Sequence, residues 1–193
     1  MSTWVIGDLQ GSFEPLERLL VALDFDADHD RLIFAGDLVN RGHDSAEILR
    51  WCRAQGQAVT AVLGNHDIHL LACAYGRAQV RSKDTIGDVL EAHDREELIA
   101  WLAGRPLWID ALDHVIVHAA VHPDWSIDQG RQIATEIEDA LSGPERDAIL
   151  DSWRTGTGRW EPNGAGVLRV TSGLAILTRM RCVTTNRDQD FTW

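Results

Sequence analysis

The sequence predicts an α/β fold built from consecutive strand–helix units. Three short apolar segments, TWVIG, RLIFAG and AVTAVLG, are each followed by a segment with helical periodicity. Each apolar segment ends in glycine, and the next residue is Asp8, Asp37 or Asn65. The intervals of 29 and 28 residues between these polar residues are typical of β-α units whose parallel strands lie side by side.

The helices of these units are predicted from apolar residues that recur with a helical period. The pattern covers residues 13–23, 45–55 and 68–75, one helix after each strand. Residues 85–103 have the pattern of one or two further helices. The first half of the chain is therefore expected to form a parallel sheet with helices packed against it.

The second half has a different pattern. We expect strands at 107–112 and 114–120, then an acidic helical region at 128–152 that is broken near a Gly-Pro pair. Residues 156–166 form a glycine-rich loop in this prediction. The apolar segment 174–185 does not distinguish helix from strand.

Composition limits the classes of function. The formal net charge of −12 argues against binding to a nucleic-acid duplex, which requires a basic surface. No apolar stretch approaches the roughly 20 residues that span a bilayer, and the N-terminus lacks the features of a secretory signal. We therefore expect a single cytoplasmic domain over residues 1–193 with no membrane partner.

The polar residues at the strand ends are suited to binding metal. Divalent ions take carboxylate, amide and imidazole ligands, and Asp8, Asp37, Asn65 and His118 supply these types. A strand-end Asp or Asn is more often a helix cap or turn residue when considered alone. The ordered series GDLQG, GDLVNRG and GNHD, followed by VIVHAA, is a combination that capping does not require.

The motifs GDLQG, GDLVNRG, LGNHDIHLL and VHAAVHPDW resemble those of the calcineurin-type metallophosphoesterases. Within that superfamily the chain is most similar to the bacterial symmetrical diadenosine tetraphosphatases, through LVNRG, WLAGRPLW, HPDW and TRMR. The resemblance covers nearly the whole chain. It implies a four-layer α-β-β-α sandwich with a two-metal site at the strand ends.

The resemblance also implies a ligand set for two divalent ions, expected to be Mn²⁺ or Co²⁺. Asp8 would bind the first ion, Asp37 would bridge the two, and Asn65 and His118 would bind the second. Gln10 stands where the wider superfamily has a histidine, so it would coordinate weakly or through water.

Other residues would contact the substrate, a dinucleoside polyphosphate. His66 would be the general acid or a transition-state donor, and Arg41 and Asn40 would hold the phosphate. Asn40 replaces the aspartate that often orients the catalytic histidine. Either Arg179 or Arg181, in TRMR, would supply a second cation, and the sequence does not distinguish them.

One family feature is absent from this sequence. The family has a further metal-binding histidine in a C-terminal GH motif, whereas no histidine follows His122 here. Two interpretations remain open: the chain lacks the closing strands of the sandwich, or another side chain such as His122 replaces the ligand.

The expected activity is metal-dependent hydrolysis of diadenosine 5′,5′-tetraphosphate to two ADP by a water activated between two metal ions. One alternative is a general or phosphoprotein phosphatase of the same superfamily. The other is a truncated, noncatalytic protein that retains metal binding. The sequence does not indicate an oligomeric state.

Overall fold

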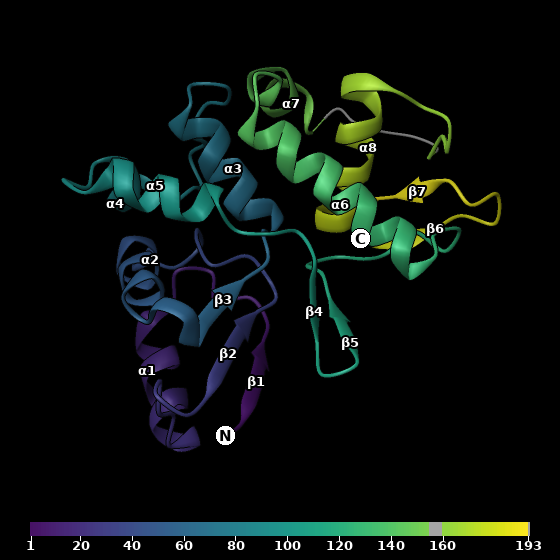
Figure 1. The fold of residues 1–193 in the computed structure, drawn as a ribbon. Helices are drawn as coiled ribbons and strands as arrows, with labels where there is room; N and C mark the ends of the chain where they lie inside the picture. The colour runs from purple at the N-terminus through teal and green to yellow at the C-terminus, as the bar shows by residue number, and fades with distance from the viewer. Residues whose placement is uncertain (155–159, 193) are drawn as a thin grey trace. The chain divides into compact units, whose positions relative to one another are not determined.

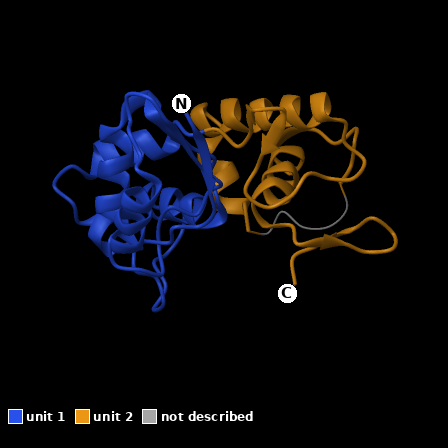
Figure 2. Ribbon diagram, turned by 90° about the horizontal axis from the view of Figure 1, so that it is seen from below, with its two compact units in different colours: residues 1–105 blue, residues 106–193 orange. Residues whose placement is uncertain are grey.

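The structure, a computed structural model, describes residues 1–154 and 160–192 (Figure 1). Contacts divide the chain into two compact units, unit 1 (residues 1–105) and unit 2 (residues 106–193), shown in separate colours in Figure 2. In the part of the chain that the structure describes, no helix is long and apolar enough to cross a membrane.

Unit 1 contains the predicted strand–helix series. Its elements are β1 (Thr3–Ile6), α1 (Phe13–Leu23), β2 (Arg31–Phe34), α2 (Ser45–Ala54), a 3₁₀ turn (Gly56–Ala58), β3 (Val59–Ala61), α3 (Asn65–Ala74), α4 (Gly87–Leu90) and α5 (Arg95–Ala103). The three strands pair in parallel in the order β1-β2-β3. Helices α1 and α2 lie on one side of this sheet (Figure 1).

The core of unit 1 follows from the apolar pattern. In β2, Leu32 and Phe34 are fully buried, and α1 turns Leu16 inward while Glu14 and Arg18 face solvent. Helix α3 buries side chains on most of its surface, so it is a core helix rather than a surface one. It begins at Asn65, three residues before the predicted start.

Unit 2 contains β4 (Ile109–Ala111), β5 (His114–Ile116), α6 (Ile127–Ser142), α7 (Arg146–Ser152), α8 (Gly166–Arg179), β6 (Cys182–Val183) and β7 (Gln189–Asp190). Strands β4 and β5 lie within the two strands predicted at 107–112 and 114–120, and they pair as an antiparallel hairpin. Its two-residue turn, Leu112–Asp113, has positive φ at both positions, as tight hairpins require.

The remaining predictions for unit 2 have mixed outcomes. The acidic helical region is broken as expected, because α6 ends at Ser142 and α7 begins at Arg146. The segment 174–185, for which the sequence did not distinguish helix from strand, contains the end of α8 followed by β6. Part of the predicted loop 156–166 lies outside the described residues.

Candidate metal centre

Asp8 lies in the loop after β1, and its exposed carboxylate is next to Gln10. The side-chain Nε2 of Gln10 donates a hydrogen bond to Asp8 Oδ2 at 3.2 Å. The backbone N–H groups of Leu9 and Gln10 both donate to the carbonyl oxygen of Asp37, at 3.1 and 2.9 Å. The loops after β1 and β2 are therefore bonded directly to each other at the carboxyl edge of the sheet.

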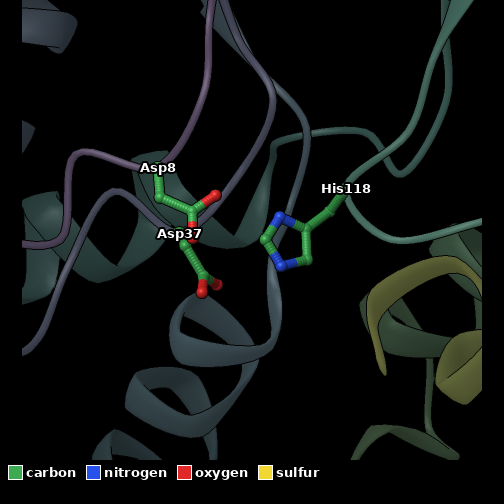
Figure 3. A group of neighbouring side chains, drawn as sticks. All are labelled: Asp8, Asp37 and His118. Carbon is green, nitrogen blue, oxygen red and sulfur yellow. The ribbon is translucent and has the colours of Figure 1, made fainter. Parts of the chain in front are cut away.

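Asp37 follows β2 and is 2% exposed. One carboxylate oxygen of Asp37 and one of Asp8 lie within 4.8 Å of each other (Figure 3). Two negative charges at this separation repel each other, and a bound divalent cation would offset that repulsion. Their oxygen atoms are also the donors that hard divalent ions prefer, so these residues fit a metal site.

A glycine allows the start of α3 to approach Asp37 closely. A Cβ atom on Gly64 would lie 2.2 Å from Asp37 Oδ1 and 2.3 Å from the Asp37 backbone nitrogen. The backbone N–H of His66, in the first turn of α3, donates to Asp37 Oδ1 at 2.8 Å. Any side chain at position 64 would displace Asp37 from this position.

The loops after β1 and β2 contain several non-glycine residues in a left-handed backbone conformation. Gln10, Asp37, Asn40 and Arg41 all have positive φ, at 46°, 50°, 75° and 68°. Such conformations cost energy in non-glycine residues, and they are common where a site requires an exact side-chain position. The strain therefore coincides with the residues predicted to bind metal and phosphate.

Asn65 and His66 are the first two residues of α3, at the same sheet edge as Asp8 and Asp37. His66 Nδ1 lies 3.0 Å from Asn40 Nδ2, and His66 Nε2 lies 3.8 Å from Asp37 Oδ2. Burial lowers the pKa of His66, and the Asp37 carboxylate opposes this change only in part. The imidazole is therefore mainly neutral at pH 7.

A third carboxyl group, that of Asp67, is completely buried next to the site. Its Oδ1 accepts from the backbone N–H of Leu38 at 3.0 Å, and its Oδ2 accepts from that of Gly64 at 2.8 Å. Burial, with an added contribution from the negative charge of Asp37, raises the pKa of Asp67 to about 8. Through its hydrogen bonds to Leu38 and Gly64, Asp67 connects the two turns that carry the candidate ligands Asp37 and Asn65.

Asn40 is fully buried, and its amide is hydrogen-bonded on both sides. Its Oδ1 accepts from the backbone N–H groups of Arg41 and Thr85, each at 2.9 Å. Its Nδ2 lies 3.0 Å from both His66 Nδ1 and Asp84 Oδ1. A direct contact between Asn40 and phosphate would require these bonds to be given up, whereas the side chain of Arg41 is exposed.

Asp84, Thr85 and His69 also belong to this site, although they are not among the site residues predicted from the sequence. Asp84 Oδ2 accepts from His69 Nε2 at 2.7 Å and from the backbone N–H of Arg81 at 2.7 Å. The spacing of His66 and His69 could have indicated one helix face. No pattern in the segment RSKDT marks Asp84, because its role depends on where the loop folds back.

His118, also drawn in Figure 3, belongs to unit 2 and lies two residues after β5. The neighbouring Ala119 N–H donates to the carbonyl oxygen of Leu177 at 2.8 Å, which fixes this segment to α8. His122 is 2% exposed, and its Nδ1 accepts from the backbone N–H of Asp124 at 3.2 Å. Its ring lies in the interior of unit 2.

The two candidate arginines of unit 2 have different surroundings. Arg179 Nη1 donates to the carbonyl oxygen of Arg154 at 3.0 Å, and its guanidinium lies over the rings of Trp153 and Phe191. Arg181 is exposed, and its backbone N–H donates to the carbonyl oxygen of Asp190 at 3.0 Å. Arg179 thus holds α8 to its neighbours, and Arg181 presents its charge to solvent.

Comparisons with known proteins agree with this geometry. The model of the calcineurin-like phosphoesterase family matches residues 1–168. Proteins named symmetrical bis(5′-nucleosyl)-tetraphosphatase from Chromobacterium violaceum and Methylococcus capsulatus are 39% and 44% identical to this chain. These alignments cover 100% and 97% of this chain, and 70% and 68% of the relatives' own lengths.

A solved structure described provisionally as a diadenosine tetraphosphatase has a TM-score of 0.56 and 29% identity. The match covers 66% of this chain and 54% of that one. The predicted α/β metallophosphoesterase fold is confirmed by these matches and by the parallel sheet of unit 1. The chain belongs to the calcineurin-like phosphoesterase family, whose members use a dimetal centre.

Proposed function

We propose that this chain is a metal-dependent hydrolase that cleaves diadenosine 5′,5′-tetraphosphate symmetrically into two ADP. The observation that carries the reaction class is the pair of carboxylates, Asp8 and Asp37, which approach within 4.8 Å beyond two adjacent parallel strands. The names of the relatives, symmetrical bis(5′-nucleosyl)-tetraphosphatases, support the substrate.

The proposed metal ligands are Asp8, Gln10, Asp37, Asn65 and His118. Two divalent ions, which we expect to be Mn²⁺ or Co²⁺, would polarise the phosphoryl oxygens and activate a water for in-line attack when bound. His118 belongs to unit 2 and the other ligands to unit 1.

The remaining roles follow from exposure and hydrogen bonding. His66 would donate the proton on its Nε2 to the leaving oxygen or to a phosphoryl oxygen in the transition state. Arg41 has an exposed guanidinium, whose planar donors suit phosphate. In TRMR we assign the phosphate contact to Arg181, because the guanidinium of Arg179 already bonds the backbone of Arg154.

Hydrolysis of diadenosine tetraphosphate with added Mn²⁺ tests the proposal, with products separated by chromatography. ADP as the only product is expected, and Asp37→Asn should lower kcat/KM at least about 100-fold because it removes a ligand charge. Asp94→Asn is the matched control, since Asp94 lies in the same unit but pairs with Arg50.

Other outcomes would point to the alternatives. Release of inorganic phosphate from phosphomonoesters or phosphoproteins, without cleavage of the dinucleotide, would indicate a general phosphatase. Absence of turnover together with fewer than two bound ions per folded chain would indicate a noncatalytic metal-binding protein. The predicted cytoplasmic location is part of the proposal, and fractionation of cells producing the chain would test it.

A further inference from the structure

The orientation of the buried Asn40 amide is determined by its neighbours. On one side lie the backbone N–H groups of Arg41 and Thr85, each 2.9 Å from the amide, and the Thr85 hydroxyl at 3.4 Å. Backbone N–H groups only donate, so this side of the amide must be the oxygen. The Nδ2 group therefore points to the opposite side.

The opposite side contains two acceptors for the two protons of Nδ2. They are Asp84 Oδ1 and His66 Nδ1, each at 3.0 Å. Because Nδ2 only donates, His66 Nδ1 must carry a lone pair, and the proton of the neutral ring is on Nε2. Nε2 is the ring atom on the Asp37 side, at 3.8 Å from Asp37 Oδ2.

Asp84 is held independently of Asn40. Its Oδ2 accepts from His69 Nε2 and from the backbone N–H of Arg81, both at 2.7 Å. The side chains of His69 and Asp84 are only 4% and 6% exposed. His69 lies one turn after His66 on α3, so the hydrogen-bonded chain His69–Asp84–Asn40–His66 begins and ends on the same rigid helix.

We propose that Asp84, anchored by His69, is a positioning residue that fixes the Asn40 amide and thereby keeps the proton of His66 on Nε2. The catalytic use of the Nε2 proton rests on the proposed function, but the hydrogen-bonded arrangement itself is a property of the metal-free chain. An aspartate at position 40 would accept from Nδ1–H and favour the opposite tautomer. The combination of Asn40 with Asp84 reverses that arrangement.

The first test is NMR of the ring nitrogens of His66 in metal-free protein, where long-range ¹H–¹⁵N correlations distinguish the two tautomers. Wild type and the control Asp94→Asn should both show the proton on Nε2. Asp84→Asn removes one acceptor oxygen from a site that bonds three donors, so the Asn40 amide loses its fixed partner. A mixture of the two tautomers is expected in this variant.

The second test exchanges the two side chains in the double variant Asn40→Asp/Asp84→Asn. The new carboxylate at position 40 accepts from Arg41, Thr85 and the new amide, while the oxygen of that amide still accepts from His69 and Arg81. Because every donor keeps a partner, this variant should fold even if Asp84→Asn does not. The proton of the neutral His66 ring should move to Nδ1.

Kinetics give a third readout with Mn²⁺ and diadenosine tetraphosphate. Asp84→Asn should lower kcat about 10–100-fold with little change in KM, because His66 acts in the transition state rather than in binding. Retention of the Nε2 proton in both the single and the double variant would overturn the inference. If wild type does not cleave the dinucleotide but the tautomer follows Asp84, the inference holds and the proposed function fails.

Discussion

Asp67, in the first turn of α3, and Asp84, which accepts a hydrogen bond from His69 of α3, are both buried carboxyl groups, but their pKa values are shifted in opposite directions. Asp67 has no exposed surface, and the side chain of Asp84 is 6% exposed. The pKa of Asp67 is raised to about 8, whereas the pKa of Asp84 is lowered to about 2. Burial alone therefore does not set the charge of a carboxyl group in this protein.

The difference lies in the neighbours. For Asp67, burial and the negative charge of Asp37 outweigh the backbone N–H groups that donate to it. For Asp84, burial would raise the pKa, but the hydrogen bond from His69, followed by those from Arg81 N–H and Asn40, outweighs it. Near pH 7 the raised pKa therefore favours the neutral, protonated form of Asp67 beside Asp37, whereas the Asp84 carboxylate stays ionised and is balanced by its hydrogen-bond donors.

The largest effect is expected at the turn that holds Asp67. Gly64→Ala places a Cβ 2.2 Å from Asp37 Oδ1, so it should cost about 3 kcal/mol of unfolding free energy. Gly87→Ala, in the Asp84 region, has nothing within 4 Å of its new Cβ and should change stability little. Urea unfolding of the metal-free variants measures both, and equal losses would show that close approach at Gly64 is unimportant.

An intermediate effect is expected from metal. Free Mn²⁺ at about 100 times its Kd should add about 2.7 kcal/mol to the unfolding free energy of wild type. Asp84→Asn should keep this gain, because Asp84 accepts hydrogen bonds from His69 and Arg81 and is not a proposed metal ligand. Asp37→Asn should lose the gain, because it removes a proposed ligand charge. Thermal unfolding with and without Mn²⁺ measures the gain, and its loss in Asp84→Asn would show that the two regions are not independent.

The smallest effect is a pH dependence of Asp84. Its folded pKa is below the unfolded value, so its contribution to stability is full above about pH 4 and is lost as pH falls towards 2. The stability difference between wild type and Asp84→Asn should shrink by about 1 kcal/mol between pH 5 and pH 3. Urea unfolding at the two pH values measures it, and a constant difference would contradict a lowered pKa.

The fold of unit 1 could be predicted because its information is local. Each strand is a short apolar run, each helix has a 3.6-residue period, and glycine marks each strand end. The type of the segment 174–185 could not be predicted, because α8 buries side chains from Thr171 to Thr178 almost continuously. Continuous burial removes the periodicity that would identify a helix.

The candidate site also contains residues whose position the sequence predicts and residues whose position it does not. Asp8, Asp37 and Asn65 could be predicted to share an edge, because the carboxyl ends of adjacent parallel strands lie together. Their roles as ligands, with Gln10 and His118, remain predictions. The full burial of Asn40 could not be predicted, since its motif position gives no indication of a partner 44 residues later in the chain.

In unit 1, the amino-acid sequence was sufficient to predict the succession of strands and helices and the polar residues that follow the strands. These features depend on contacts between residues close in the chain, which periodicity and turn chemistry describe. The hydrogen bonds from His69 to Asp84 and from Asn40 to Asp84 and His66 became apparent only in the folded chain. That arrangement depends on the path by which the loop at residues 81–85 returns to the sheet, and the energy that fixes it comes from hydrogen bonds between distant segments.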